Sequence, residues 1–205
     1  MPNDKEAMLD KFCGILKRID ALEFGTFKLS SGRVTPYYID LRVVSSFPDA
    51  FHEILGLCVD YVRSKLSEDF DRIAGIPIAG IPFASILAYH LSKPFIFIRQ
   101  GVRLHGRERR IEGVLISGDR VLLVDDLITT GLGLRRAAAA VRSEGGVVTD
   151  AFVLLDREEG GTKRLLDGGV EVNSLFRVSE VTTRLYEMNV ITEDQLDIVA
   201  KQVKK

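Results

Sequence analysis

Two adjacent acids followed by a turn of small residues form the most distinctive chemical pattern in this sequence. An apolar run at residues 121–124 leads into Asp125 and Asp126, and residues 129–133 then read Thr-Thr-Gly-Leu-Gly before a helical pattern. Amide groups at a helix start point outward at the positive end of the helix dipole, and glycine lets an anion approach the main chain. The pattern therefore predicts a phosphate-binding turn, with two threonine hydroxyls as further donors, beside a pair of carboxylates.

Each half of this pattern also has a structural interpretation. Asp and Thr are common helix caps, and glycine is common in turns. Adjacent carboxylates at a strand end repel each other, however, unless a hydroxyl-rich or cationic ligand occupies the site. The spacing matches neither the Walker phosphate loop nor the dinucleotide fingerprint. We therefore favour a ligand-binding role for the combined pattern.

A second chemical pattern is a basic segment that contains glycines. Residues 99–110 hold five arginines and one histidine, with Gly101 and Gly106 between them. Such a segment can fold over a polyanion and place donors where negative charge builds up on a departing group. An isolated basic run is more often a solvated surface, so its meaning depends on its surroundings.

Two further segments combine aromatic or basic side chains with turn residues. Residues 27–42 include Tyr37 and Tyr38 and the turn-former Gly32, which is a hairpin pattern. Residues 154–161 read Leu-Leu-Asp-Arg-Glu-Glu-Gly-Gly. A guanidinium such as that of Arg157 can grip a carboxylate through two parallel hydrogen bonds, although an Arg next to Glu at a strand end is ordinarily a surface ion pair.

These segments must be positioned by a sheet, because short apolar strands alternate with helical patterns along the chain. We expect a helix at 8–23, a hairpin at 26–44, a helix at 49–66, a strand at 72–76, a helix ending at 91, strands at 94–98 and 121–124, a helix ending at 144 and a strand at 147–155. This alternation predicts a mainly parallel α/β sheet that is covered by helices on both faces, with ligands beyond the carboxyl ends of the strands.

The composition is that of one globular domain. The 205 residues are 46% hydrophobic and 28% charged, with a formal charge of −1, so no overall attraction to nucleic acid is indicated. Cys13 and Cys58 have neither the number nor the spacing of a disulfide framework or a zinc site, and we expect buried thiols. The N-terminal residues lack a secretory signal, which favours a cytoplasmic location. Pro77 and Pro82 break the uncharged stretch at residues 73–91, which argues against a membrane helix.

The motifs closely resemble those of type I phosphoribosyltransferases, from about residue 8 to about residue 200. The resemblance implies one domain over residues 1–205, with an N-terminal hood at about 8–45 and a core sheet with helices at about 70–180. It also implies that Asp125 and Asp126 hold the ribose 2′ and 3′ hydroxyls of phosphoribosyl diphosphate (PRPP), while residues 129–133 wrap its 5′-phosphate. Residues 75–82 would contact the diphosphate, although a packed strand-to-helix turn explains that segment equally well. The implied PRPP-binding residues are Asp125, Asp126, Leu127, Ile128, Thr129, Thr130, Gly131, Leu132, Gly133, Arg99, Gln100, Arg103 and His105.

The basic segment resembles the mobile catalytic loop of the orotate phosphoribosyltransferases, in which Arg, Lys, Lys and His recur before a glycine. Arg99, Gln100, Arg103 and His105 occupy those positions, so both family lysines are replaced. Arg103 keeps the charge, but a guanidinium is not a simple substitute for a flexible ammonium, which bears on the rate more than on the reaction type. Gly133 stands where many relatives have serine. The resemblance implies catalytic roles for Arg99, Arg103 and His105, and a homodimer, because this loop commonly reaches into the partner subunit's site.

Two segments resemble the parts of that family that select orotate. Residues 27–42 are similar to its N-terminal substrate segment, a lid over the pyrimidine, and residues 156–161 closely resemble its Asp-Arg-Glu-Glu-Gly-Gly string. Orotate differs from uracil by its carboxylate, for which Arg157 is the implied partner. The implied orotate-binding residues are Thr129, Arg157, Tyr37 and Tyr38.

The resemblance implies that a ring nitrogen of orotate displaces diphosphate from PRPP, giving orotidine 5′-monophosphate in pyrimidine biosynthesis. Mg²⁺ is the implied cofactor, held mainly by the substrate, with Asp125 or Asp126 as the protein contact. The implied partners are the two substrates and a second copy of the chain, without nucleic acid or membrane. Two alternatives stay open: a phosphoribosyltransferase for another base, and a regulator that uses the ligand as a signal. Against the regulator, the segment ahead of residue 27 is too short for a helix-turn-helix domain.

Overall fold

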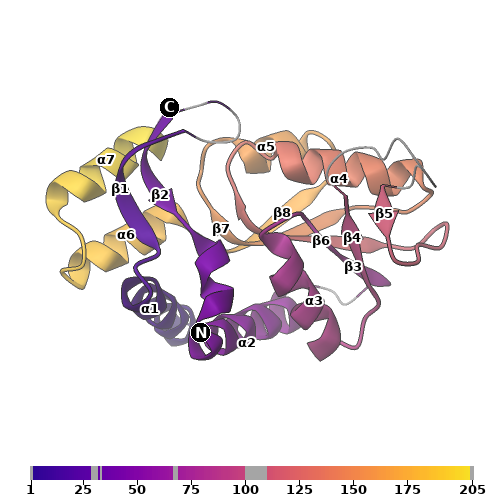
Figure 1. Ribbon diagram of the computed structural model, residues 1–205, viewed down its shortest axis with the longest axis horizontal. Coiled ribbons are helices and arrows are strands. Elements are labelled where there is room, and N and C mark those ends of the chain that lie inside the picture. The colour runs from indigo at the N-terminus through magenta and orange to yellow at the C-terminus, as the bar shows by residue number, and fades with distance from the viewer. Residues whose placement is uncertain (1, 29–31, 33, 67–68, 100–109, 204–205) are drawn as a thin grey trace.

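A six-stranded sheet in the order β5-β4-β3-β6-β7-β8 forms the centre of the molecule (Figure 1). The computed structural model describes residues 2–28, 32, 34–66, 69–99 and 110–203. All neighbouring strands of this sheet pair in parallel except β4 and β5, which are antiparallel. The strands are β3 (Arg72–Gly75), β4 (Phe95–Ile98), β5 (Ile111–Glu112), β6 (Val121–Ile128), β7 (Asp150–Asp156) and β8 (Glu171–Arg177). The mainly parallel sheet predicted from the alternating pattern is confirmed.

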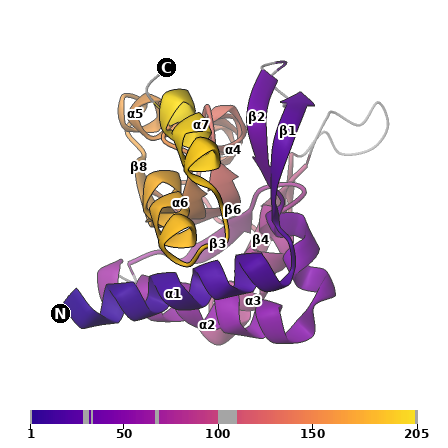
Figure 2. The same cartoon turned by 90° about the vertical axis from the view of Figure 1, so that its left-hand side faces the viewer.

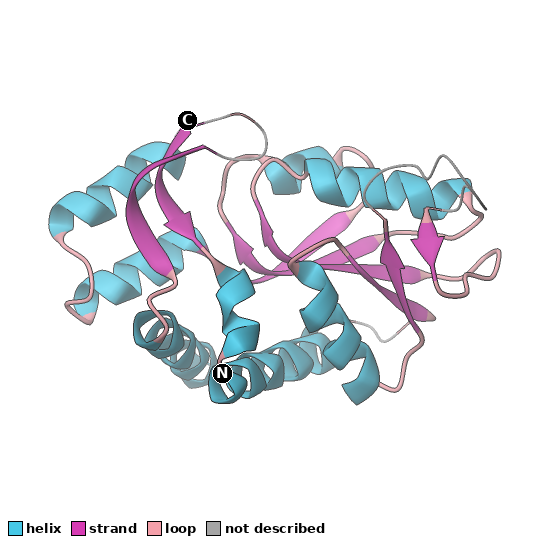
Figure 3. Cartoon of the chain, in the orientation of Figure 1, coloured by secondary structure: helices cyan, strands magenta, loops and turns pink. Residues whose placement is uncertain are grey.

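Helices cover both faces of this sheet (Figures 1 and 3). One face carries α2 (Pro48–Lys65) and α3 (Gly80–His90), and the other carries α4 (Leu132–Ser143) and α5 (Gly161–Leu166). Successive residues of a strand enter opposite apolar layers: in β6, Leu122 and Val124 join the layer of α2 and α3, and Leu123 joins the layer of α4. A sheet that is buried on both faces needs apolar side chains at every position, which explains why these strands read as continuous apolar runs.

A separate antiparallel hairpin lies beside the main sheet. It consists of β1 (Leu22–Lys28) and β2 (Val34–Ile39), and the 3₁₀ helix η1 (Leu41–Ser46) follows it. The chain returns from β8 through α6 (Val178–Glu187) to α7 (Glu193–Val203), which packs against β2 (Figure 2). The hairpin is therefore held between the C-terminal helices and the main sheet.

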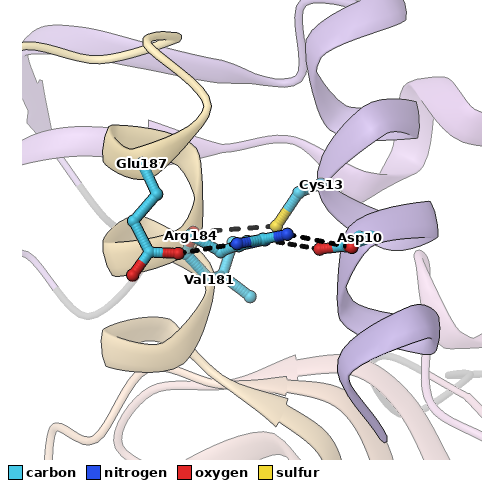
Figure 4. Close-up of polar contacts among 5 residues, drawn as sticks. All are labelled: Asp10, Cys13, Val181, Arg184 and Glu187. Carbon is cyan, nitrogen blue, oxygen red and sulfur yellow. Dashed lines mark hydrogen bonds and ion pairs between the residues drawn. The ribbon is translucent and has the colours of Figure 1, made fainter. Parts of the chain in front are cut away.

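A small network of polar side chains joins the first helix to α6 (Figure 4). α1 (Pro2–Arg18) contributes Asp10, which accepts hydrogen bonds from Arg184 of α6, and Arg184 Nη1 also lies 2.8 Å from Glu187 Oε2. The hydrogen bond from Arg184 lowers the pKa of Asp10. Beneath this exposed network, the Cys13 thiol is buried and points to the Val181 carbonyl oxygen at 3.7 Å, and burial raises its pKa to about 12. Surface ion pairs are individually weak, so the buried side chains beneath contribute most of the stability of this contact.

The predicted elements agree with the structure apart from their boundaries. The helix predicted over 8–23 runs from Pro2 to Arg18, because residues from Leu22 onward pair with β2. The strand predicted over 147–155 begins at Asp150. The strand predicted to end at residue 124 instead continues to Ile128, because its pairing with β7 starts at Leu123 and extends to Ile128. The two acids are therefore part of the strand and do not follow it.

Three other predictions can be compared directly with the structure. Cys13 and Cys58 are buried free thiols, as predicted. The uncharged stretch at residues 73–91 is divided into β3, a turn and α3, as its prolines predicted. None of the helices in the described part of the chain is both long and apolar enough to span a bilayer.

Candidate active site

A cleft with a volume of about 640 Å³ opens at the carboxyl ends of the central strands. Its walls come from the turn after β3, the end of β4, the end of β6 with the turn that follows, and one side of α4. All nine residues of the segment 125–133, which we name the phosphate cradle, line it. This edge is where a parallel sheet presents ligand sites, so the sequence-predicted location is consistent with the structure.

Two glycines shape the phosphate cradle, one within it and one packed against it. Gly131 precedes α4 with a φ of 74°, a left-handed conformation that glycine adopts without steric cost. Gly161 packs directly beneath the turn: a Cβ atom there would lie 2.6 Å from the Thr129 carbonyl oxygen and 2.9 Å from the Gly131 nitrogen. The turn is thus supported by Gly161 of α5, and the first residues of α4 line the cleft, where helix-start amides can bind an anion.

The charged forms of Asp125 and Asp126 are unfavourable where these side chains lie. They are half-buried, and the Asp126 N–H donates to Asp125 Oδ1 at 3.0 Å. Burial raises the pKa of both carboxyls, and the charge of Asp126 raises that of Asp125 further. A ligand that donates hydrogen bonds to these oxygens, or brings a cation, would relieve the strain.

A divalent cation fits this site only with help from a ligand. Two adjacent carboxylates offer the hard oxygen donors that Mg²⁺ prefers. Among the residues described, however, no group of three or more His, Cys, Asp or Glu side chains is arranged to hold a metal. A bound Mg²⁺ would therefore take most of its ligands from substrate oxygens and water.

The described lining of the cleft also includes three arginines. Arg99 Nη1 donates to Glu112 Oε1 at 2.7 Å, and the Arg99 N–H donates to the Arg110 carbonyl oxygen at 2.8 Å. Arg110 and Arg136 line the same cleft. Sequence reasoning missed Arg136 as a site residue, although its place about one helical turn after the cradle could have indicated it.

Arg157 lies beside the cleft and not in its wall. Its side chain is 1% exposed, with Nε 3.1 Å from Glu159 Oε1 and Nη2 donating to Thr35 Oγ1 at 3.0 Å. The guanidinium carbon lies 4.4 Å from the centre of the Tyr37 ring. We name Thr35, Tyr37, Arg157 and Glu159 the junction cluster, because it joins the hairpin to the end of β7. Tyr38, the next residue of β2, faces elsewhere, 5.5 Å from the Phe27 ring and under Arg42.

The other acids of the segment after β7 have structural roles. Asp156 accepts hydrogen bonds from the Glu158 N–H and from Thr162 Oγ1, both at 2.7 Å. Glu158 in turn accepts the Ser179 N–H at 3.0 Å, at the first turn of α6. These contacts close the turn after β7 and leave Arg157 and Glu159 directed into the interior.

Comparison with known proteins assigns the chain to a family. Residues 45–167 match the family model described as the phosphoribosyl transferase domain. Over 200 residues the chain is 37% identical to an orotate phosphoribosyltransferase of Sulfolobus acidocaldarius, with 98% of this chain and 95% of the relative covered. The chain belongs to the orotate phosphoribosyltransferase family.

Solved structures agree with this assignment. The orotate phosphoribosyltransferase from Aeropyrum pernix superposes with a TM-score of 0.75 at 31% identity, covering 85% of this chain and 99% of that one. Leishmania donovani UMP synthase gives a TM-score of 0.85 at 30% identity, covering 95% of this chain but 42% of that longer one. The fold class and the enzyme class predicted from the sequence are confirmed.

Within this orotate phosphoribosyltransferase fold, the predicted site residues fall into three groups. The phosphate cradle and Arg99 share one cleft. Tyr37 and Arg157 contact each other in the buried junction cluster, whereas Tyr38 lies outside it. Gln100, Arg103 and His105 lie outside the described residues.

Proposed function

We propose that this chain transfers the ribose 5-phosphate group of PRPP to orotate in the cleft at the end of β6, giving orotidine 5′-monophosphate and diphosphate. The phosphate cradle carries the proposal, because it places two raised-pKa carboxylates beside the first amides of a helix within one cleft. Carboxylates accept hydrogen bonds from a ribose diol, and helix amides bind a phosphate. A phosphorylated pentose carries a diol for the carboxylates and a phosphate for the helix amides.

The proposed chemistry is displacement at the anomeric carbon, for which the chain supplies alignment and charge. Asp125 and Asp126 would fix the sugar through its hydroxyls, and residues 129–133 would fix its 5′-phosphate. Arg99, which donates to Glu112, lines the cleft and would neutralise the growing charge of the departing diphosphate. Arg103 and His105 are expected to assist from the loop.

Mg²⁺ is proposed as the cofactor, with Asp125 and Asp126 as the protein groups within its reach. When bound, it would supply neutralisation of the diphosphate charge. The chain's own carboxylates would still hold the ribose hydroxyls, so metal and sugar would be bound by one pair of side chains.

Orotate is proposed to lie between the hairpin and the ends of β6 and β7. Thr129 lines the cleft there, and the Arg157 N–H donates to the Ile128 carbonyl oxygen at 3.0 Å, which links the junction cluster to the cradle. The Arg157 guanidinium contacts Thr35 through Nη2 and Glu159 through Nε, so orotate would bind to the donors that these contacts leave.

A homodimer is also proposed. Support comes from the likeness of the basic segment to a loop that serves the partner subunit's site, and from large apolar side chains exposed near the cleft and on α3. Ile78, in the cleft wall, is 73% exposed, and Tyr89 is 80% exposed. Sedimentation equilibrium tests the dimer: a single species at monomer mass over a wide range of concentrations would contradict it. The cytoplasmic location expected from the sequence stays a prediction.

An absorbance assay tests the proposed reaction. Purified protein is mixed with orotate, PRPP and Mg²⁺, and loss of orotate absorbance is followed, with uracil, adenine and hypoxanthine in parallel reactions. We expect orotate alone to be consumed, and only when both PRPP and Mg²⁺ are present. Consumption of another base with orotate untouched would refute the substrate assignment, and PRPP binding without turnover of any base would support the regulator.

A further inference from the structure

Glu112 is an acid just outside the cleft that contacts one of the arginines of the cleft wall. Its Oε1 atom accepts a hydrogen bond from Arg99 Nη1 at 2.7 Å. Arg99 lines the cleft, whereas Glu112 is not among the described residues of the lining. The bond uses one of the five N–H donors of the guanidinium, and no other acceptor within the described residues bonds to it. Glu112 thus holds Arg99 from outside the cleft and leaves four donors for a ligand.

A short antiparallel ladder fixes the backbone of both residues. β5 pairs with β4 so that Glu112 lies opposite Phe97, and the Arg99 N–H donates to the Arg110 carbonyl oxygen at 2.8 Å. Directly after Glu112 the chain packs onto β4, since a Cβ atom at Gly113 would lie 2.9 Å from a side-chain carbon of that strand. Paired residues, and residues two apart on one strand, point to the same face of a sheet. Glu112 and Arg99 therefore meet as diagonal neighbours on one face.

The charges of the cleft explain why a cation there needs a fixed partner. Arg110 and Arg136 line the same cleft and repel a third guanidinium, whereas Asp125 and Asp126 attract it. Within the described residues, however, the ion pair of Arg99 is with Glu112 and with neither of these two acids. A long arginine side chain has many rotamers, and a carboxylate bound at 2.7 Å restricts them. The bond to Glu112 therefore selects one position of the Arg99 guanidinium.

We infer that Glu112 is a positioning residue for the proposed reaction, which holds the Arg99 guanidinium at the cleft wall for the charge that develops on the diphosphate. The inference rests on the proposed function, in which Arg99 neutralises that charge. Donors that are fixed before the reaction stabilise a transition state better than donors that must first be ordered. Since half-exposed ion pairs add little stability, the bond between Glu112 and Arg99 acts on the rate and not on folding.

Steady-state kinetics of Glu112→Gln, Arg99→Gln and the double variant test the inference. We expect kcat to fall about 10-fold in Glu112→Gln and about 100-fold in Arg99→Gln, with the KM for orotate and the melting temperature unchanged. The double variant should be no slower than Arg99→Gln alone, because Glu112 acts only through Arg99. Glu112→Asp keeps the charge on a shorter side chain and should recover part of the rate. The control is Glu53→Gln, which removes the acid of another Arg–Glu pair, with Arg18 at 2.9 Å, and should leave kcat unchanged.

Calorimetric binding of inorganic diphosphate with Mg²⁺ separates positioning from a simple effect of charge. If Glu112 acted only as a nearby negative charge, its neutralisation would tighten diphosphate binding. Positioning predicts the opposite, about 5-fold weaker binding in Glu112→Gln and no further weakening when Arg99→Gln is already present. Tighter binding, an unchanged kcat, or equal effects of Glu112→Gln with and without Arg99 would each overturn the inference. If the wild type binds diphosphate but consumes no orotate, the proposed function fails, and the binding measurements still decide the role of Glu112.

Discussion

The phosphate cradle and the junction cluster are neighbours built in opposite ways. The cradle is one continuous segment, residues 125–133, that faces an open cleft. The junction cluster brings Thr35 and Arg157 together across 122 residues of sequence and buries them. The cradle leaves two acids with raised pKa values, whereas the cluster pairs its guanidinium with Glu159. The cradle keeps unfavourable charge that a ligand can compensate, and the junction cluster uses an ion pair to hold the hairpin against β7.

The largest effect is expected from neutralising the cradle acids in Asp125→Asn/Asp126→Asn. Each lost hydrogen bond to a charged acceptor costs about 1.5–3 kcal/mol, so kcat/KM for PRPP should fall about 100-fold or more. The unliganded fold should not lose stability, because the removed charges are unfavourable there. Steady-state kinetics check the loss of activity, and thermal unfolding checks that stability is kept. The control is Asp60→Asn, at an exposed position on α2. If the variant lost activity only because it unfolded, the cradle acids would be needed for folding, and the two regions would not differ as described.

The same contrast explains why the cradle could be predicted from the sequence and the junction cluster could not. The cradle could be predicted because its neighbours in space are neighbours in the chain: a strand, two acids and a helix start occur in order. The strand's extension to Ile128 could not, since it depends on pairing with β7. The burial of Arg157 against Tyr37 depends on how a distant hairpin packs, and an Arg-Glu-Glu string looks the same whether exposed or enclosed.

Removing one partner of the buried ion pair should give the next largest effect. Arg157→Met removes the guanidinium whose Nε lies 3.1 Å from Glu159 Oε1, and loss of one member of a buried ion pair typically costs about 3–5 kcal/mol of stability. Arg157→Met/Glu159→Met replaces both charges with apolar groups and should recover much of that loss. Urea unfolding measures the stability, and the double variant then tests the role of Arg157 in a folded protein. Should the single and double variants be equally unstable, the pair would not be what fastens the hairpin.

Two glycines of the cradle offer a matched pair of substitutions. Gly131→Ala forces a side chain into a left-handed conformation, where its Cβ would lie 2.5 Å from Leu165 Cδ1, and should cost about 1–3 kcal/mol while raising the KM for PRPP. At Gly133 a Cβ meets nothing nearer than Ile76 Cγ2 at 3.8 Å, so Gly133→Ala should stabilise by about 0.5 kcal/mol. Thermal unfolding and PRPP titration distinguish the two. Equal losses at both positions would mean that the backbone of the turn is not shaped as described.

The smallest effect at neutral pH is expected from Tyr37→Phe in the junction cluster. The Tyr37 hydroxyl is buried and forms no hydrogen bond within the described residues, so its removal should change stability by less than about 0.5 kcal/mol near pH 8. Burial raises the pKa of Tyr37 to about 12 despite the charge of Arg157, which lowers it. An unfolded tyrosine releases its proton near pH 10, so between about pH 10 and 12 the unfolded wild type binds fewer protons than the folded protein. Wild-type stability should therefore fall relative to Tyr37→Phe as the pH rises, by about 1 kcal/mol at pH 11. Urea unfolding of both proteins at pH 8 and 11 measures this, and parallel pH dependence would show that Tyr37 is not enclosed with Arg157.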